Sequence, residues 1–218
     1  VKKAKGELIA FLDADDWRER KKLEAQIKVF KKSIVILSYT NYKIHDEQNK
    51  TIKTAFKNLP DGLITDRLLK KNFIGMCTLM FRRKSYFELK KGFDHKFEII
   101  GDYDLCLRLS INQTAKSINQ CLSHYRWHPN NLSNTKRKLN FLELIRWAKK
   151  NKKFEKFSNF KYLENFSNFQ LGLSLILDNK KIKVIKILKK LNSYYRIKLF
   201  LLIMMPIKLI KVLKNTKF

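Results

Sequence analysis

Apolar and polar positions follow two different rhythms along the first 134 residues of the chain. Short apolar runs rich in Ile, Val, Tyr and Thr, which are typical of strands, alternate with segments in which apolar residues recur every three or four positions, as in amphipathic helices. Strands are predicted over Leu8–Leu12, Ile34–His45, Ile74–Phe81 and Lys116–Trp127. Helices are predicted over Arg18–Lys32, Ile64–Lys71, Arg83–Lys90 and Asp102–Asn112. This alternation predicts an α/β fold in which helices flank a sheet.

Beyond Asn134 the pattern changes to helical periodicity alone. Helices are predicted over Leu139–Lys149, Phe157–Leu177, Ile182–Leu191 and Ile197–Leu213. We therefore predict two domains, an α/β domain over residues 1–134 and an all-helical extension over residues 135–218.

The charge of the chain is extreme, with a formal net charge of +29 in 218 residues. Residues 179–218 contain twelve Lys or Arg and no acid. Such a balance favours nucleic acid or an anionic membrane surface as a partner. Within this region Leu199–Ile207 is a nine-residue apolar run, which is too short to span a bilayer because a spanning helix needs about 20 apolar residues.

Lysines frame this apolar run on both sides, as in interfacial amphipathic helices. They are Lys198, Lys208, Lys211 and Lys214. The pattern predicts peripheral docking on the inner face of the membrane; the alternative is that this helix packs on the rest of the protein or on a partner chain. Three cysteines, Cys77, Cys106 and Cys121, match no zinc spacing, and a reducing, cytoplasmic compartment is the simpler expectation.

The stretch with the most chemical content is Leu8–Trp17, where five apolar residues end in three carboxylates, Asp13, Asp15 and Asp16. A short continuous apolar run suits a strand that is buried on both faces, and its carboxyl end is where open α/β sheets bind ligands. Carboxylates this close together are costly unless a cation neutralises them, and few hard oxygens suit Mg²⁺ or Mn²⁺ carried with a diphosphate. The alternative is that Asp15 or Asp16 caps the helix that follows.

A second acidic centre lies at Gly101-Asp102, before a strongly apolar helix. Glycine allows a tight approach at this point, and a carboxylate at a helix start is stabilised by free backbone N–H groups. A firmly held Asp102 is suited to act as a general base, although an N-cap is the simpler alternative. His128 precedes Pro129, so its backbone is expected to be extended, and imidazole is a common ligand beside two carboxylates.

Three segments resemble, in order, the motifs of family 2 glycosyltransferases. Gly6–Trp17 resembles their central Asp-x-Asp segment, Ile100–Leu109 their acceptor-side acidic motif, and Tyr125–Ser133 the segment that follows it. The resemblance runs from about Lys5 to Ser133. It implies a GT-A (Rossmann-like) fold with a mixed sheet, a nucleotide-sugar donor, a saccharide or lipid-linked acceptor, Mn²⁺ or Mg²⁺, and inversion at the anomeric carbon.

The resemblance also implies roles for individual residues. Asp15 would hold the metal, Asp13 would contact the donor or share the metal, and His128 would approach the metal or the diphosphate. Asp102 matches the base that deprotonates the acceptor hydroxyl. The remaining acidic and glycine positions of these motifs that are expected to bind substrate are Asp16, Gly101 and Asp104.

The chain departs from the family pattern in three respects. The usual Glu-Asp pair is Gly101-Asp102 here, and no Gln-x-x-Arg-Trp motif is found, so transfer of a single sugar is expected. The N-terminal half of the family domain, which holds the nucleotide base, is expected to precede this chain, which alone could be inactive.

Two rival interpretations stay open. A basic nucleic-acid-binding protein would explain the charge through phosphate contacts, but it would not explain the clustered acids at Asp13–Asp16 and Asp102–Asp104, and no RNA-binding or zinc-finger motif is visible. We therefore expect no nucleic-acid partner. The second rival is an inactive remnant that only docks on membranes.

Overall fold

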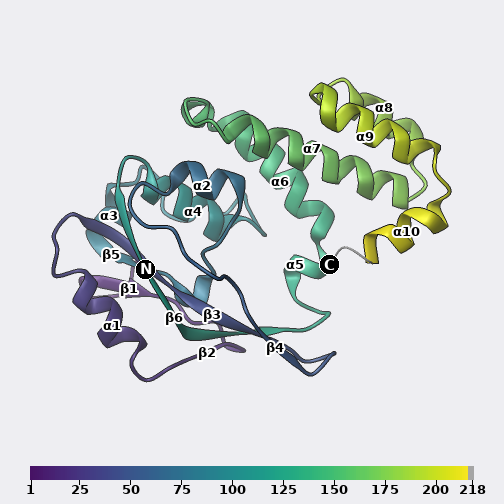
Figure 1. Cartoon of the computed structure of the whole chain (residues 1–218). Coiled ribbons are helices and arrows are strands. Elements are labelled where there is room, and N and C mark those ends of the chain that lie inside the picture. Colours follow the sequence, from purple (N-terminus) through teal and green to yellow (C-terminus); the bar gives the residue numbers. More distant parts are fainter. Residues whose placement is uncertain (216–218) are drawn as a thin grey trace. The chain divides into compact units, whose positions relative to one another are not determined.

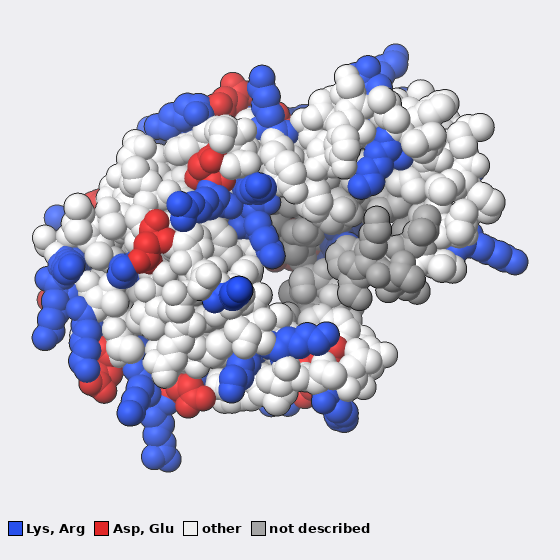
Figure 2. All heavy atoms as spheres, viewed as in Figure 1, with Lys and Arg blue, Asp and Glu red and all other residues white. Residues whose placement is uncertain are grey.

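The computed structural model of the chain describes residues 1–215 and divides it into two compact units, Val1–Thr135 and Lys136–Phe218. The last three positions of the predicted helical extension, 216–218, lie outside the described residues. Each unit is described by itself below. On the visible face of the molecule Lys and Arg side chains outnumber Asp and Glu, as the net charge requires (Figure 2).

The first unit is built on one mixed sheet with the strand order β1-β5-β3-β6-β2, to which β4 is added beside β3 (Figure 1). The strands are β1 (Leu8–Ala10), β2 (Trp17–Arg18), β3 (Val35–Asp46), β4 (Thr51–Thr54), β5 (Met80–Arg82) and β6 (Thr114–Trp127). The two long central strands, β3 and β6, run parallel, and the other pairs are antiparallel. The α/β class and the mixed sheet are thereby confirmed.

Helices cover the sheet, with α1 on one side and α2 and α4 on the other (Figure 1). The helical elements are α1 (Lys22–Val29), α2 (Thr65–Lys70), η1 (Met76–Thr78), α3 (Arg83–Glu88), α4 (Gly101–Ser110) and α5 (Leu132–Thr135). A small apolar cluster of Phe30, Val35 and Met80 lies beside α1. Leu105 and Leu107 of α4 are fully buried and Leu109 nearly so, which holds the start of this helix in place.

Strand β1 is an edge strand within the described sheet, and the expectation of a strand buried on both faces is wrong. It pairs only with β5, and of its three residues Ile9 alone is buried. The predicted strand Ile74–Phe81 is wrong in its first half, which forms the 3-10 turn η1. There the Thr78 hydroxyl donates to the Gly75 carbonyl and the Gln26 amide donates to the Thr78 carbonyl, so side chains satisfy the backbone in place of a ladder.

The predicted helix Arg18–Lys32 begins four residues late, at Lys22. The reason is tertiary pairing: Trp17 and Arg18 form β2 opposite His124 and Ser123 of β6. Because these two residues are extended in the sheet, the helix can begin only after them.

The second unit is all helical. Its elements are α6 (Arg137–Lys150), η2 (Lys152–Phe154), α7 (Phe160–Leu177), α8 (Lys181–Leu188), α9 (Ser193–Met204) and α10 (Ile207–Asn215). The single helix predicted over Ile197–Leu213 is wrong, because the chain is extended at Met205 and Pro206 lacks the N–H needed to continue a helix. Among the described residues no helix is both long and apolar enough to cross a bilayer.

Helices α7 and α9 approach closely at Gly172. A Cβ added there would lie 2.5 Å from Cδ2 of Leu199, whose side chain is fully buried. Leu199 belongs to the apolar core of this unit, together with Phe169, Ile176 and Val184. One face of α9 is therefore fixed against α7.

Candidate functional site

The carboxylates Asp13, Asp15 and Asp16 lie in the turn between β1 and β2. Asp13 and Asp15 are exposed, whereas Asp16 is only 9% exposed. Partial desolvation raises the pKa of Asp13, and the charge of Asp15 raises it further. The turn thus brings the first two carboxylates close enough to repel one another.

Asp16 fastens this turn to the end of β6. Its Oδ1 accepts the backbone N–H of Arg126 at 3.0 Å, and the Cys77 thiol donates to the same carboxylate. The alternative of a helix cap is not what the structure has, because the N-cap residue of α1 is Lys21 and no side chain caps that end. Asp16 positions its neighbours.

Arg126 reinforces the attachment. Its Nε donates to the Asp15 carbonyl at 2.9 Å and its guanidinium pairs with Glu47 at 2.7 Å. The guanidinium also lies 5.5 Å from the ring centroid of Trp17. Through these contacts Arg126 of β6, itself held by Glu47 just after β3, fixes the backbone that carries the exposed carboxylates.

His128 comes to the same place from the loop after β6. Its Nε2 lies 3.5 Å from Oδ2 of Asp15. Among the described residues no group of three or more His, Cys, Asp or Glu is placed to hold a metal ion. Asp15 and His128 supply a carboxylate and an imidazole, a donor set that fits Mn²⁺ or Mg²⁺ when substrate oxygens complete the coordination.

Asp102 lies half-buried in the first turn of α4, and its Oδ1 accepts the N–H of Tyr103 at 2.7 Å. Burial raises the pKa of Asp102, the hydrogen bond from the Tyr103 N–H lowers it, and the charge of Asp13 raises it further. The N-cap residue is Ile100, so capping is not the role of Asp102. The two acidic centres, far apart in sequence, lie within electrostatic range of one another.

Two other predicted positions in this helix have different surroundings. Asp104 is 2% exposed and pairs with Arg108 at 2.6 Å; Arg108 also donates to the carbonyls of Lys91 and Gly92. This pairing gives Asp104 a structural role, and its contact with substrate stays a prediction. At Gly101 an added Cβ would come within 4.0 Å of Phe93, which is an ordinary contact, so the protein itself does not crowd this position, and contact of Gly101 with substrate stays a prediction.

A row of rings beside the carboxylates escaped sequence reasoning. Trp17 stacks on His124 with ring centroids 5.0 Å apart, His124 Nδ1 lies 2.9 Å from Nε2 of His45, and His124 Nε2 lies 2.9 Å from Oε1 of Glu19. The neighbouring imidazole and desolvation lower the pKa of His45, with desolvation the larger cause. The alternation of a strand could have indicated part of this arrangement, because His124, Arg126 and His128 are spaced two apart and therefore point to the same side.

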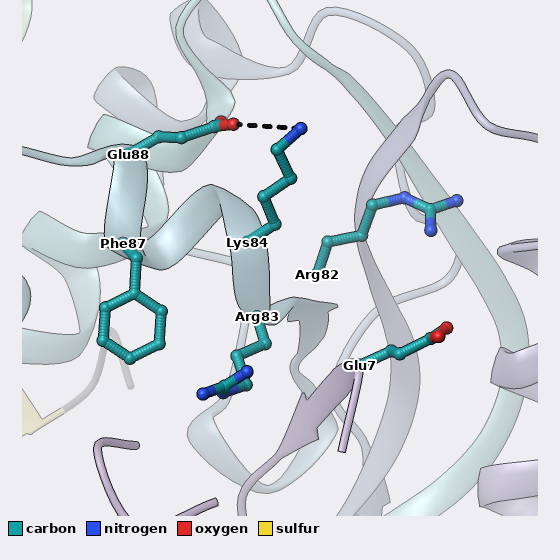
Figure 3. Close-up of a pocket in the computed structure, with 6 residues that line it drawn as sticks. All are labelled: Glu7, Arg82, Arg83, Lys84, Phe87 and Glu88. Carbon is teal, nitrogen blue, oxygen red and sulfur yellow. Dashed lines mark ion pairs between the residues drawn. The ribbon is translucent and has the colours of Figure 1, made fainter. Parts of the chain in front are cut away.

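A separate pocket of about 610 Å³ lies away from these carboxylates. It is lined by Glu7, Arg82, Arg83, Lys84, Phe87 and Glu88 (Figure 3). Glu7 precedes β1 whereas Asp13 follows it, so the pocket and the carboxylates occupy opposite ends of that strand. The guanidinium groups of Arg82 and Arg83 point to opposite sides, and Arg82 is engaged by the carbonyls of Phe30 and Val35, so the cations do not converge.

Comparison with known proteins follows the same motifs. The sequence model of the family described as "Glycosyltransferase like family 2" matches residues 1–175, a longer range than the motifs span. TuaG of Bacillus subtilis (strain 168), assigned to teichuronic acid biosynthesis as a glycosyltransferase, is 31% identical over 139 residues, 62% of this chain and 53% of that protein. The Escherichia coli "UDP-Glc:alpha-D-GlcNAc-diphosphoundecaprenol beta-1,3-glucosyltransferase WfgD" is 33% identical over 139 residues, 62% of this chain and 52% of that protein.

A solved structure gives the fold comparison. Staphylococcus aureus TarS 1–349 in complex with UDP-GlcNAc superposes with a TM-score of 0.54 at 11% identity, covering 89% of this chain and 60% of that one. The likeness confirms the expected fold type. The chain spans about half the length of the curated relatives TuaG and WfgD.

Proposed function

Because the chain belongs to glycosyltransferase family 2, whose model matches residues 1–175, we propose that it contributes the catalytic end of an inverting transferase. The reaction moves one sugar from a nucleotide-sugar donor to a hydroxyl of a saccharide or lipid-linked acceptor. The observation that carries the proposal is the convergence of the two acidic centres: the charge of Asp13 raises the pKa of Asp102, although the two residues lie 89 positions apart in the sequence.

Asp102 is the proposed base. An acceptor oxygen forms a bond to the anomeric carbon while the bond from that carbon to the diphosphate oxygen breaks, and the acceptor proton passes to the Asp102 carboxylate. Attack opposite the leaving group inverts the anomeric centre. Burial raises the pKa of Asp102, which suits a base because transfer is most efficient when the pKa approaches the working pH. Such a base is typically worth about 10²–10⁴-fold in rate.

Asp15 and His128, which lie 3.5 Å apart, are the residues we propose to hold Mn²⁺ or Mg²⁺, with Asp13 sharing the ion or contacting the donor. A divalent ion there would neutralise charge on the diphosphate leaving group. The role of the protein is to fix these side chains, which it does through Asp16 and Arg126. Asp16 therefore acts through position, and its substitution is expected to displace Asp15.

The relatives suggest the acceptor class. WfgD of Escherichia coli is named for transfer to a diphosphoundecaprenol-linked sugar, and TuaG for teichuronic acid biosynthesis. We accordingly propose an acceptor in cell-surface polysaccharide or glycolipid synthesis, used at the cytoplasmic face of the membrane. TarS binds UDP-GlcNAc, which makes uridine diphosphate sugars the first donors to test.

The test is release of nucleoside diphosphate by the complete gene product, across a panel of nucleotide sugars with Mn²⁺, Mg²⁺ or chelator. Asp15→Ala and Asp102→Asn remove the proposed ligand and base. Asp178→Asn is the matched control, since Asp178 is an exposed carboxylate in the second unit that pairs with Lys138. We expect metal-dependent release that falls by about 10²–10⁴-fold in Asp102→Asn and is unchanged in the control.

The opposite outcomes are equally definite. Release that survives both substitutions would overturn the site assignment. No release with any donor, combined with salt-sensitive binding of RNA or DNA, would favour the basic nucleic-acid-binding interpretation. Vesicle binding without release would favour a remnant that only docks on membranes.

A further inference from the structure

The outer face of α9 carries an apolar stripe. Five of its side chains are each more than half exposed: Tyr194, Ile197, Phe200, Leu201 and Met204. Four of them follow the three-four-three spacing that places residues on one side of a helix. The opposite side of α9 is already occupied, because Leu199 is fully buried against α7 near Gly172. The stripe is therefore surface that remains after the helix has packed in its own unit.

The stripe has a cation along each border. At 100° per residue, Lys198 falls beside Tyr194 on one border and Arg196 beside Phe200 on the other. Arg196 is anchored there by donating to the carbonyls of Leu188 and Leu191, at 3.1 Å and 2.8 Å. The Lys198 ammonium lies 5.9 Å from the ring centroid of Tyr194. Contacts within the unit therefore hold both cations at the edges of the stripe.

The neighbouring helices share this character. Further exposed apolar side chains are Ile182 and Ile185 on α8 and Leu209 and Val212 on α10. Residues 179–218 contain twelve Lys or Arg and no Asp or Glu. In the part of the molecule that holds these helices, Figure 2 shows blue side chains projecting from an otherwise uncharged surface.

Charge decides which partner fits such a surface. In a symmetric contact between two copies the same stripe meets itself, so the cationic borders would face one another with no acid of this region to neutralise them. Nucleic acid would engage the cations, but aliphatic side chains such as Ile197 and Leu201 add nothing to phosphate binding. An anionic bilayer satisfies both features, since its acyl region takes apolar side chains and its headgroups take the cations.

We propose that the α9 stripe is a docking surface for an anionic lipid bilayer, in which α9 lies in the interfacial plane. Sugar transfer as proposed above does not require this surface, so the two can fail independently. The stripe differs from the sequence-based expectation, which placed the interfacial helix at Leu199–Ile207 and included Leu199, now found in the core.

The test is sedimentation of the full chain with vesicles of phosphatidylglycerol and phosphatidylcholine mixed in equal parts, compared with phosphatidylcholine alone. The variant Ile197→Gln/Leu201→Gln removes the centre of the stripe without touching its packed face. We expect its partition coefficient to fall by roughly tenfold or more, given the methylene groups withdrawn from lipid. Wild-type binding to the mixed vesicles should weaken as salt rises, because each cation near an anionic surface raises the partition coefficient about fivefold and salt screens this attraction.

The matched control is Ile34→Gln/Leu63→Gln, which changes the same residue types at positions that are 66% and 69% exposed in the first unit. It should bind vesicles like the wild type. A second reporter is Phe200→Trp, whose added tryptophan emission should shift to shorter wavelength on mixed vesicles and remain unshifted in buffer.

Three outcomes would overturn the proposal. One is absence of vesicle binding by the wild type. Another is equal binding by the stripe variant and the wild type. The third is a wild type that is dimeric in solution and becomes monomeric only in the stripe variant, which would assign the stripe to a second copy of the chain.

Discussion

At the scale of single residues, Asp102 and Asp104 lie two positions apart in the same helix yet have opposite surroundings. Asp102 is half-buried beside the other acidic centre, whereas Asp104 is held by Arg108 at 2.6 Å inside the protein. Sequence alone could not separate them, since both belong to the same motif at a helix start. The contact with Arg108 distinguishes the two residues, because it already engages the carboxylate of Asp104 within the protein.

Asp104→Ala should therefore lower the free energy of unfolding by about 3 kcal/mol, because it leaves the Arg108 guanidinium, whose side chain is only 12% exposed, without its carboxylate. Glu88→Ala is the matched control: Glu88 also pairs at i,i+4, with Lys84 at 3.9 Å, but it is exposed. Its loss should change stability by less than about 0.5 kcal/mol. Urea unfolding measures both, and equal effects would show that burial of the Asp104 pair does not matter.

Lys22 is a buried cation on α1. Its side chain is fully buried, and among the described residues its Nζ has no hydrogen-bond partner. Burial lowers the pKa of Lys22 to about 8 from its ordinary 10.5. Between these values the unfolded chain binds more protons than the folded one, so the free energy of unfolding rises as pH increases from about 8 to 10.5.

Lys22→Met should stabilise the protein at pH 7 by about 1–3 kcal/mol, since it removes the desolvation cost of the charge and keeps the volume. It should also abolish the contribution of Lys22 to the rise in stability above pH 8. Lys21→Met, at the exposed neighbouring position, is the control and should do neither. Urea unfolding at pH 7 and pH 10 decides: a destabilised Lys22→Met would mean that the ammonium is stabilised where it lies.

At the scale of elements, patterns predicted helices and strands well where local and tertiary preferences agree. Strand β3 and helix α6 match their predicted ranges to within two residues at each end. Prediction failed where a distant partner decided the structure: β2 forms because β6 lies opposite it, and Ile74 precedes a 3-10 turn stabilised by Gln26. No local pattern carries that information.

The same limit applies to the candidate site. The acids Asp13, Asp15 and Asp102 could be named from their motifs. Arg126, which ties two backbone segments to one another, could not be, because its partners Asp15 and Glu47 lie 111 and 79 positions away. Residues that carry chemistry leave a motif, whereas residues that position them are known only from the fold.

Gly172 is the element-scale test, since it sets the distance between α7 and α9. Gly172→Ala would place a Cβ 2.5 Å from Leu199 Cδ2, and forced repacking should cost about 1–3 kcal/mol. In a Leu199→Ala background the same change should cost nothing or stabilise the helix, because the obstruction is gone and alanine favours helix. Urea unfolding of the wild type and the three variants gives the cycle, and equal costs in both backgrounds would contradict the close approach.

At the scale of the whole molecule, a net charge of +29 means that folding gathers like charges into a small volume. Self-repulsion of this kind destabilises a compact state. Salt should relieve it, because the Debye length shortens from about 30 Å at 0.01 M to about 10 Å at 0.1 M.

Raising the salt concentration across this range at pH 7 should increase the melting temperature by about 2–4 °C, the change expected for roughly 1 kcal/mol in a chain of this size. The control is the same titration near the isoelectric point of about 10.1, where the net charge vanishes and the gain should disappear. Scanning calorimetry measures both. A salt effect of equal size at both pH values would point to general ion effects in place of self-repulsion.

The parallel pairing of β3 with β6 has a consequence for how the protein is made. Val35 lies opposite Thr114 and Asp46 opposite Trp127, and the central pair of the sheet joins residues 78 to 81 positions apart. Contacts of such long range form slowly. On the ribosome β3 emerges long before β6, so its apolar residues and backbone edge stay unpaired until β6 has been synthesised. An unpaired strand edge is prone to aggregation, so synthesis of this protein should depend on chaperones until residue 127 has left the exit tunnel.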